Sequence, residues 1–234
     1  MNDAAGAANS SSPSPQDRLA AQLRGFGPVG ILAMLAIAAG QIAAPLGAVL
    51  VLIWTGLSRT PWRELGYVRP RSWVGGLVVG MVFGASFKLL MKAIVMPLLG
   101  ANPTNPAYHY LVGNWAALPA AALTMIVVGG FGEETVFRGY LFLELRKLIG
   151  WSVAARIATV VVTAALFASL HYLDQGLPGA EQATITGLVF GTIFAVTGRI
   201  WMLMCAHAAF DLTAVAIIYL NLESPMAHPF FRQP

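Results

Sequence analysis

Long apolar runs separated by short polar stretches dominate this chain of 234 residues. A membrane-spanning helix needs about 20 predominantly apolar residues. Apolar runs occupy residues 27–57, 73–98, 116–147, 153–172, 182–197 and 199–221. None shows the alternation of a membrane β-strand, so we predict an all-α, polytopic transmembrane helical bundle.

The first apolar run is too long for one straight span and contains Gln41 and Pro45. It is therefore either one kinked helix or a pair of short helices, because proline interrupts helical hydrogen bonding. The predicted number of spans is six or seven.

The composition agrees with a membrane protein: 57% of residues are hydrophobic and 10% are charged, whereas a soluble domain has about 25% charged residues. We expect one transmembrane domain over 26–222, a disordered tail over 1–25 and a short C-terminal tail over 223–234. The net charge of +4 is spread between apolar runs and does not indicate nucleic-acid binding. Cys205 is the only cysteine, which excludes an intrachain disulfide.

Basic residues fall in alternate loops, and cytoplasmic loops are the ones enriched in Lys and Arg. The loops at 58–72, 147–153 and 197–200 contain or adjoin Arg and Lys, whereas 99–115 and 173–181 contain neither. We therefore place the 58–72 loop in the cytoplasm.

Charged residues interrupt the run at 116–147. Glu133 and Glu134 are adjacent, and Arg138 follows four residues after the second acid. Ionised groups at bilayer depth cost roughly 2.5–3.5 kcal/mol each, so they usually mark a functional site. On an α-helix, Glu134 and Arg138 share a face and can pair. Glu133 would point about 100° away from Glu134, which predicts different neighbours for the two acids.

Three more polar residues lie in later apolar runs. His171 ends the run Phe167–His171, and His207 and Asp211 share a face of the last segment. A buried carboxylate beside a histidine can activate water, and further polar groups can stabilise a developing oxyanion. Two histidines and a glutamate could instead bind zinc. The residues alone leave both possibilities open.

Glu133-Glu134-x-x-x-Arg138, Phe167-x-x-x-His171 and His207-x-x-x-Asp211 occur in this order on successive apolar segments. This set resembles the CAAX protease and bacteriocin-processing family, which includes the Ras-converting endoprotease and the bacterial Abi proteins. The resemblance covers roughly residues 60–221. It implies a multi-pass protein of a bacterial-type cytoplasmic membrane, with a catalytic core at about 116–221.

By this resemblance the protein is an intramembrane endopeptidase of the CAAX-processing type. Glu133 would activate water together with His171, and His207 and Asp211 would bind the substrate carbonyl. Glu134 and Arg138 would brace the site. The eukaryotic-type motif has Asn where this chain has Asp211, and an ionised Asp only accepts hydrogen bonds. Asp211 could therefore orient His207 instead.

The resemblance implies no cofactor, with zinc on His171, His207 and Glu133 as the alternative. The expected partners are membrane lipid and a peptide or protein substrate, with or without a lipid modification, and no nucleic acid. Two other functions stay open: a non-catalytic scaffold or immunity protein of the same family, and a proton-coupled transporter. Lys88 and Lys92 share one face, either snorkelling to the interface or acting as counter-ions.

Overall fold

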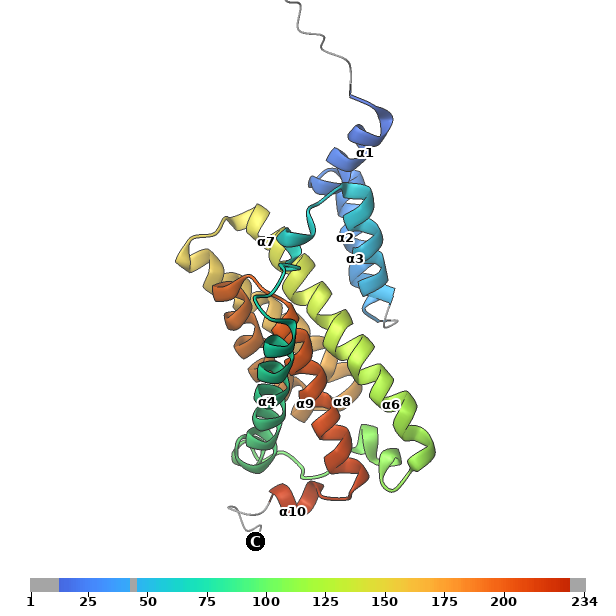
Figure 1. The fold of residues 1–234 in the computed structure, drawn as a ribbon, viewed down its shortest axis with the longest axis vertical. Coiled ribbons are helices and arrows are strands. Elements are labelled where there is room, and N and C mark those ends of the chain that lie inside the picture. The colour runs from blue at the N-terminus through green and yellow to red at the C-terminus, as the bar shows by residue number, and fades with distance from the viewer. Residues whose placement is uncertain (1–12, 43–45, 228–234) are drawn as a thin grey trace, which may run out of the picture.

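The structure is a computed structural model that describes residues 13–42 and 46–227. Within these residues the chain forms helices and no strand, which confirms the all-α prediction. Figure 1 shows an elongated bundle in which α2 and α3 stand beside the upper part of the longer helices and α1 lies above them.

The N-terminal part consists of α1 (Pro15–Arg24), α2 (Pro28–Gly40) and α3 (Leu46–Ser58). The first apolar run is thus a pair of short helices, and α2 and α3 lie side by side. A Cβ atom on Gly40 would lie 2.9 Å from the backbone nitrogen of Gly47, so the two helices approach closely near their turn. Pro45 lies outside the described residues.

The prediction of a disordered tail over 1–25 differs from the structure, because α1 lies within it. Ser14 caps this helix by accepting a hydrogen bond from the Asp17 amide, and the Asp17 side chain accepts one from the Ser14 amide. Such a reciprocal capping box stabilises a helix start, and Arg59 also pairs with Asp17. Residues 1–12 of the predicted tail, and 228–234 of the C-terminal tail, are outside the described part.

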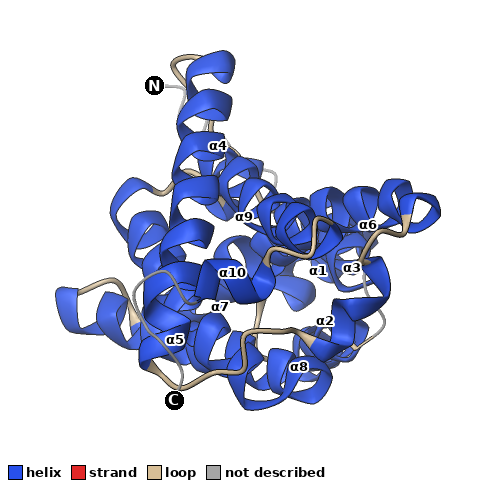
Figure 2. Cartoon of the chain, turned by 90° about the horizontal axis from the view of Figure 1, so that it is seen from below, coloured by secondary structure: helices blue, strands red, loops and turns tan. Residues whose placement is uncertain are grey.

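The remaining elements follow in chain order. They are η1 (Trp62–Leu65), α4 (Trp73–Leu90), η2 (Met91–Val95), α5 (Met96–Leu98), η3 (Pro106–Leu111), η4 (Trp115–Ala117), α6 (Leu118–Thr124), η5 (Met125–Glu133), η6 (Thr135–Leu141), α7 (Phe142–Ile149), α8 (Val153–Thr197), α9 (Trp201–Tyr219) and α10 (Glu223–Ala227). Figure 2, viewed from the lower end, shows α10 lying across the bundle.

Four helical stretches of the described chain are long and apolar enough to cross a membrane: Trp73–Leu98, Trp115–Ile149, Val153–Thr197 and Trp201–Tyr219. The bent pair α1 and α2 would make a fifth. The chain therefore has the helices of a multi-pass membrane protein. These four or five candidate spans are fewer than the six or seven predicted. The count treats α8 as a single helix.

Helix α8 is bent back on itself at Gly176, whose φ of 64° and ψ of −158° are not helical. A Cβ atom on Gly187 would touch Ala164, and one on Gly191 would touch Val160. Residues further along the second half of α8 therefore contact residues that come earlier in its first half, so the two halves run antiparallel. A straight helix of 45 residues would be about 68 Å long, more than twice the hydrocarbon thickness of a bilayer.

Helices α4 and α9 pack closely along their length. A Cβ atom on Gly84 would lie 1.9 Å from the carbonyl oxygen of Ala206, and one on Gly80 would lie 2.6 Å from that of Met202. Small residues at this spacing let membrane helices approach backbone to backbone. This contact fixes the position of α9, which carries His207 directly after Ala206.

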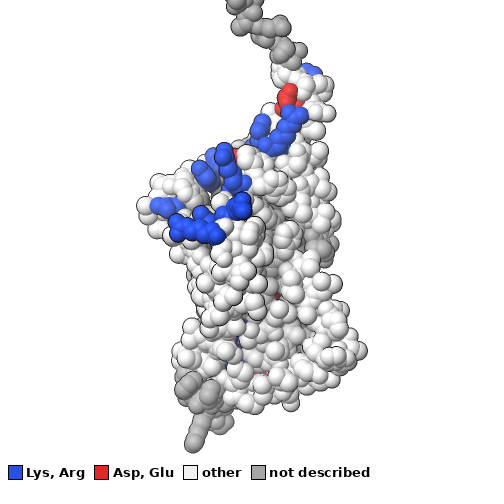
Figure 3. Space-filling model, viewed as in Figure 1, with Lys and Arg blue, Asp and Glu red and all other residues white. Residues whose placement is uncertain are grey.

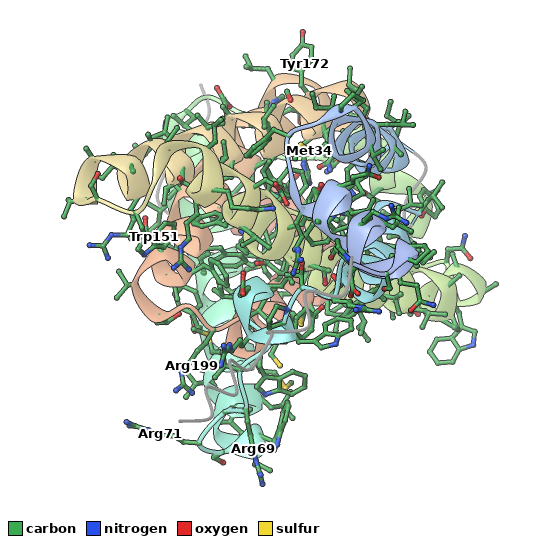
Figure 4. All side chains as sticks on the ribbon, turned by 90° about the horizontal axis from the view of Figure 1, so that it is seen from above. Met34, Arg69, Arg71, Trp151, Tyr172 and Arg199 are labelled. Atoms are coloured by element: carbon green, nitrogen blue, oxygen red, sulfur yellow. The ribbon has the colours of Figure 1, made fainter. Side chains whose placement is uncertain are left out.

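Lys and Arg side chains gather at the upper end of the molecule, and the rest of the visible surface is almost free of charge (Figure 3). Figure 4 looks onto this end and shows Arg69, Arg71 and Arg199 near the starts of α4 and α9. The two helices begin side by side, since the Trp201 indole donates to the Trp73 carbonyl at 3.1 Å. The basic loops predicted to share one side therefore do lie at one end.

Candidate active site

The helix that carries the two acids is π-helical rather than α-helical around them, over η5 and η6. Such i→i+5 segments are rare and are frequent at functional sites. Gly129 and Gly130 lie in η5, where a Cβ atom on Gly129 would come within 2.5 Å of Asp211 Oδ2. One on Gly130 would come within 2.9 Å of the Met204 carbonyl oxygen. The glycines thus let α9 lie directly against the helix that carries the two acids.

His207 lies at the centre of the site and contacts both acids. Its Nδ1 atom is 2.7 Å from Glu134 Oε1, and its Nε2 atom is 3.5 Å from Glu133 Oε2. Asp211 Oδ2 is 3.6 Å from the same Nε2 atom. The two acids thus share His207, which they reach from different sides, but their other neighbours differ as expected, because only Glu134 of the two contacts Arg138.

Glu134 and Arg138 form the buried side of this arrangement. Arg138 Nη1 donates to Glu134 Oε1 at 2.9 Å, as their spacing predicts, and the two side chains are 2% and 0% exposed. The guanidinium also lies over the rings of Phe167 and Phe190, at 5.0 and 5.6 Å from their centroids. Because an ionised carboxylate only accepts hydrogen bonds, His207 donates from Nδ1 to Glu134, which fixes the imidazole orientation.

Glu133 and Asp211 form the open side. Each side chain is 23% exposed, and both line a cavity of about 460 Å³. That volume is within the usual range of about 300–1,000 Å³ for small-molecule and cofactor pockets. The site therefore has an enclosed half, Glu134 with Arg138, and a half that faces the cavity, Glu133 with Asp211.

His171 also reaches the cavity, from the first half of α8. Its Nδ1 atom donates to the Phe167 carbonyl at 2.9 Å, and its ring lies 4.3 Å from the Phe167 ring. The other ring nitrogen of His171, Nε2, takes no part in this hydrogen bond. A further cavity of about 160 Å³ is lined by Glu133, His171 and the tip of the α2–α3 pair, including Gln41 and Ala48.

Tyr108, in η3, lines both cavities and was not identified from the sequence. Burial raises the pKa of its hydroxyl to about 12, and the carboxylates of Asp211 and Glu133 act in the same direction. The residue lies in a loop between apolar runs, where no local pattern separates it from an ordinary interfacial aromatic. Only the fold brings it to the acids.

Lys88 lines the larger cavity as well. It is 9% exposed, and its Nζ atom donates to Gln182 Oε1 at 2.8 Å. The snorkelling interpretation is therefore wrong for this residue. Lys92 pairs with Glu223 at 3.4 Å and also donates to the Pro103 carbonyl.

The zinc alternative would place His171, His207 and Glu133 around one ion. Across the described ranges, no group of three or more His, Cys, Asp or Glu side chains has the arrangement of a metal site. His171 and His207 each have a ring nitrogen directed at an oxygen acceptor, which is also common behind metal ligands.

Residues 115–213 match the family model of the Rce1-like type II CAAX prenyl endopeptidases. Over this segment, which is less than half of the chain, the sequence is similar to the Rce1-like family. The matched segment contains all three motifs, from Glu133 to Asp211, and confirms the family resemblance over a shorter range than the 60–221 expected. No curated protein and no solved structure matches the chain.

Proposed function

We propose that this Rce1-like protein is an intramembrane endopeptidase that hydrolyses a peptide bond with water activated by Glu133. The observation that carries the proposal is the two-sided contact of His207, held by Glu134 from behind and flanked by Glu133 and Asp211 on the cavity side. A general base must lie within reach of the attacking water, and the carbonyl oxygen needs donors that are already in place.

In this mechanism Glu133 takes a proton from water as the water oxygen attacks the carbonyl carbon. Collapse of the tetrahedral intermediate breaks the C–N bond, and Glu133 returns the proton to the leaving amine. His171 lies on the same cavity wall and helps to orient that water. His207 acts as an imidazolium, which donates from Nε2 to the carbonyl oxygen while its Nδ1–H stays bonded to Glu134. Asp211, on the following turn of α9, orients the Nε2 side of the imidazole. Arg138 holds Glu134 and does not face the cavity.

We further propose that each half of α8 crosses the membrane, which raises the number of crossings above the count for unbroken helices. The contacts of Gly187 with Ala164 and of Gly191 with Val160 support this reading. The basic end would then face the cytoplasm, since positively charged loops are retained there. Cysteine labelling of single-cysteine variants at Leu177 and Arg71, from each side of sealed vesicles, tests both statements.

From the family name we propose that the substrates are peptides of the prenylated C-a-a-X class. The test uses an internally quenched peptide ending in a prenylated C-a-a-X sequence, incubated with purified protein and with the Glu133→Ala variant. Membrane peptides from cells with either form are compared in parallel, because the natural substrate need not be prenylated. Cleavage by the wild type alone supports the proposal. A correctly folded wild type that cleaves neither the peptide nor any membrane protein would favour the non-catalytic scaffold.

A further inference from the structure

Lys88 is a buried cation in the wall of the proposed substrate cavity. Its ammonium donates to the neutral side-chain oxygen of Gln182 and lies 4.8 Å from the centroid of the Phe210 ring. An ammonium carries three donors, so these contacts leave hydrogen-bonding capacity. Burying a charge inside a membrane protein is costly and usually serves an interaction.

No ion pair joins Lys88 to a carboxylate anywhere in residues 13–42 and 46–227. The other lysine of this face differs, because Lys92 is bound to Glu223 near the lower end of the cavity. The two acids whose charges act on Lys88, Asp211 and Glu223, contact His207 and Lys92 respectively. Lys88 is therefore the cation of this cavity wall that lacks a bound carboxylate in the described chain.

The position of Lys88 relates it to the reaction. Phe210 is three residues beyond His207 on α9, which corresponds to about 4.5 Å along the helix. An extended peptide advances about 3.3–3.6 Å per residue. A group bound at Lys88 would thus belong to a residue only a few positions from a bond held at Glu133.

We propose that Lys88 binds a carboxylate of the peptide substrate and so selects and positions it in the cavity. This inference rests on the proposed endopeptidase function. The carboxylate comes either from the C-terminus of the peptide or from an acidic side chain near the scissile bond, and both present the same acceptor oxygens. Gln182 and the Phe210 ring hold the ammonium in place.

The test measures binding separately from cleavage. Three fluorescent C-a-a-X peptides of one sequence are compared: one with a free C-terminus, one with a C-terminal amide, and one amide with Glu as its last residue. Binding is measured on the Glu133→Gln protein, which cannot turn over substrate, and on the same protein carrying Lys88→Met or Lys88→Arg. The wild-type kcat/KM is measured on all three peptides.

We expect the free peptide to bind about tenfold or more tightly than its amide, since a charge-assisted hydrogen bond commonly contributes that much. Lys88→Met should abolish the difference, and Lys88→Arg should retain part of it. Recovery of binding by the acidic amide would assign the site to a side-chain carboxylate; failure to recover would assign it to the C-terminus.

Equal binding of the free peptide, the amide and the acidic amide, or binding of none of them, would overturn the proposal even if the wild type cleaves all three. A binding difference without any wild-type cleavage would leave Lys88 as a carboxylate site and refute the endopeptidase function instead. The three peptides are first compared on the Glu133→Gln protein with Lys88 intact, so this comparison does not depend on the folding of any Lys88 variant. Thermal unfolding in detergent checks that folding separately.

Discussion

His207 Nδ1 lies 2.7 Å from Glu134 Oε1, so the acid next to the proposed base holds the imidazole rather than facing the substrate. The same oxygen also accepts from Arg138 Nη1 at 2.9 Å. Adjacent glutamates on one helix thus have different positions, one bonded to His207 and the other facing the cavity. This division yields predictions that distinguish loss of chemistry from loss of structure.

Replacing Glu133 should remove activity and leave the fold intact. Glu133→Gln keeps the size of the side chain but cannot accept the proton from water, and loss of a general base typically costs about 10²–10⁴-fold in rate. Cleavage of the quenched peptide and thermal unfolding in detergent are the measurements, with the exposed Glu64→Gln as the matched control. A Gln variant that cleaves at the wild-type rate would show that Glu133 is not the base.

Arg138→Ala should destabilise the protein as well as inactivate it. The change leaves Glu134 as a buried acid without its cation, and breaking a buried ion pair typically costs about 3–5 kcal/mol. It also removes the guanidinium from the Phe167 and Phe190 rings. Unfolding in detergent measures the loss, and the exposed Arg63→Ala serves as control. Unchanged stability of Arg138→Ala would contradict the structural role of the pair.

Asp211→Asn should retain most activity, whereas Asp211→Ala should lose it. An asparagine amide can contact His207 and can also donate to the substrate carbonyl, so we expect less than about a tenfold loss, equivalent to 1.4 kcal/mol in the barrier. Alanine can do neither, so His207 would be left unoriented, and loss of an oxyanion donor commonly costs about 10²–10³-fold. The kcat of both variants tests this. Equal losses in the two would indicate that the negative charge itself is required.

Much of the fold could be predicted from the sequence, because apolar runs and i,i+4 spacings are local signals. The runs at 73–98, 116–147 and 199–221 are helical, and the Glu134–Arg138 pair follows from its spacing. The contact between His207 and Glu134 could not be predicted, since the two residues lie on different helices and are 73 positions apart in the sequence. The π-helical turns around the acids also lack a local signature, although they determine where Glu133 points.

The approach of α4 to α9 provides a stability prediction that is independent of the chemistry. A Cβ atom on Gly84 would lie 1.9 Å from a backbone oxygen that cannot rotate away, so Gly84→Ala should destabilise by about 1–3 kcal/mol or more. Gly56, also helical, has nothing within 4 Å of such an atom. Gly56→Ala should therefore stabilise slightly, by about 0.5–1 kcal/mol. Opposite shifts in the unfolding temperature are expected; similar shifts would refute the close packing of α4 on α9.

Activity should not depend on added metal. In the proposed mechanism the base is Glu133 and the carbonyl is held by His207, with Arg138 supplying positive charge behind Glu134. Zinc catalysis would instead require three protein ligands around an open position, and His171, His207 and Glu133 are the candidates. Elemental analysis of purified protein should find far less than one zinc per chain, and cleavage should continue after prolonged treatment with a chelator.

The control separates metal removal from damage to the protein. Chelator-treated samples are assayed with and without added zinc, and their unfolding in detergent is compared with that of untreated protein. Stoichiometric zinc, activity lost on chelation and activity restored by zinc alone would together overturn the glutamate mechanism. His171, His207 and Glu133 would then be ligands, and the water would be activated by the metal rather than by the carboxylate.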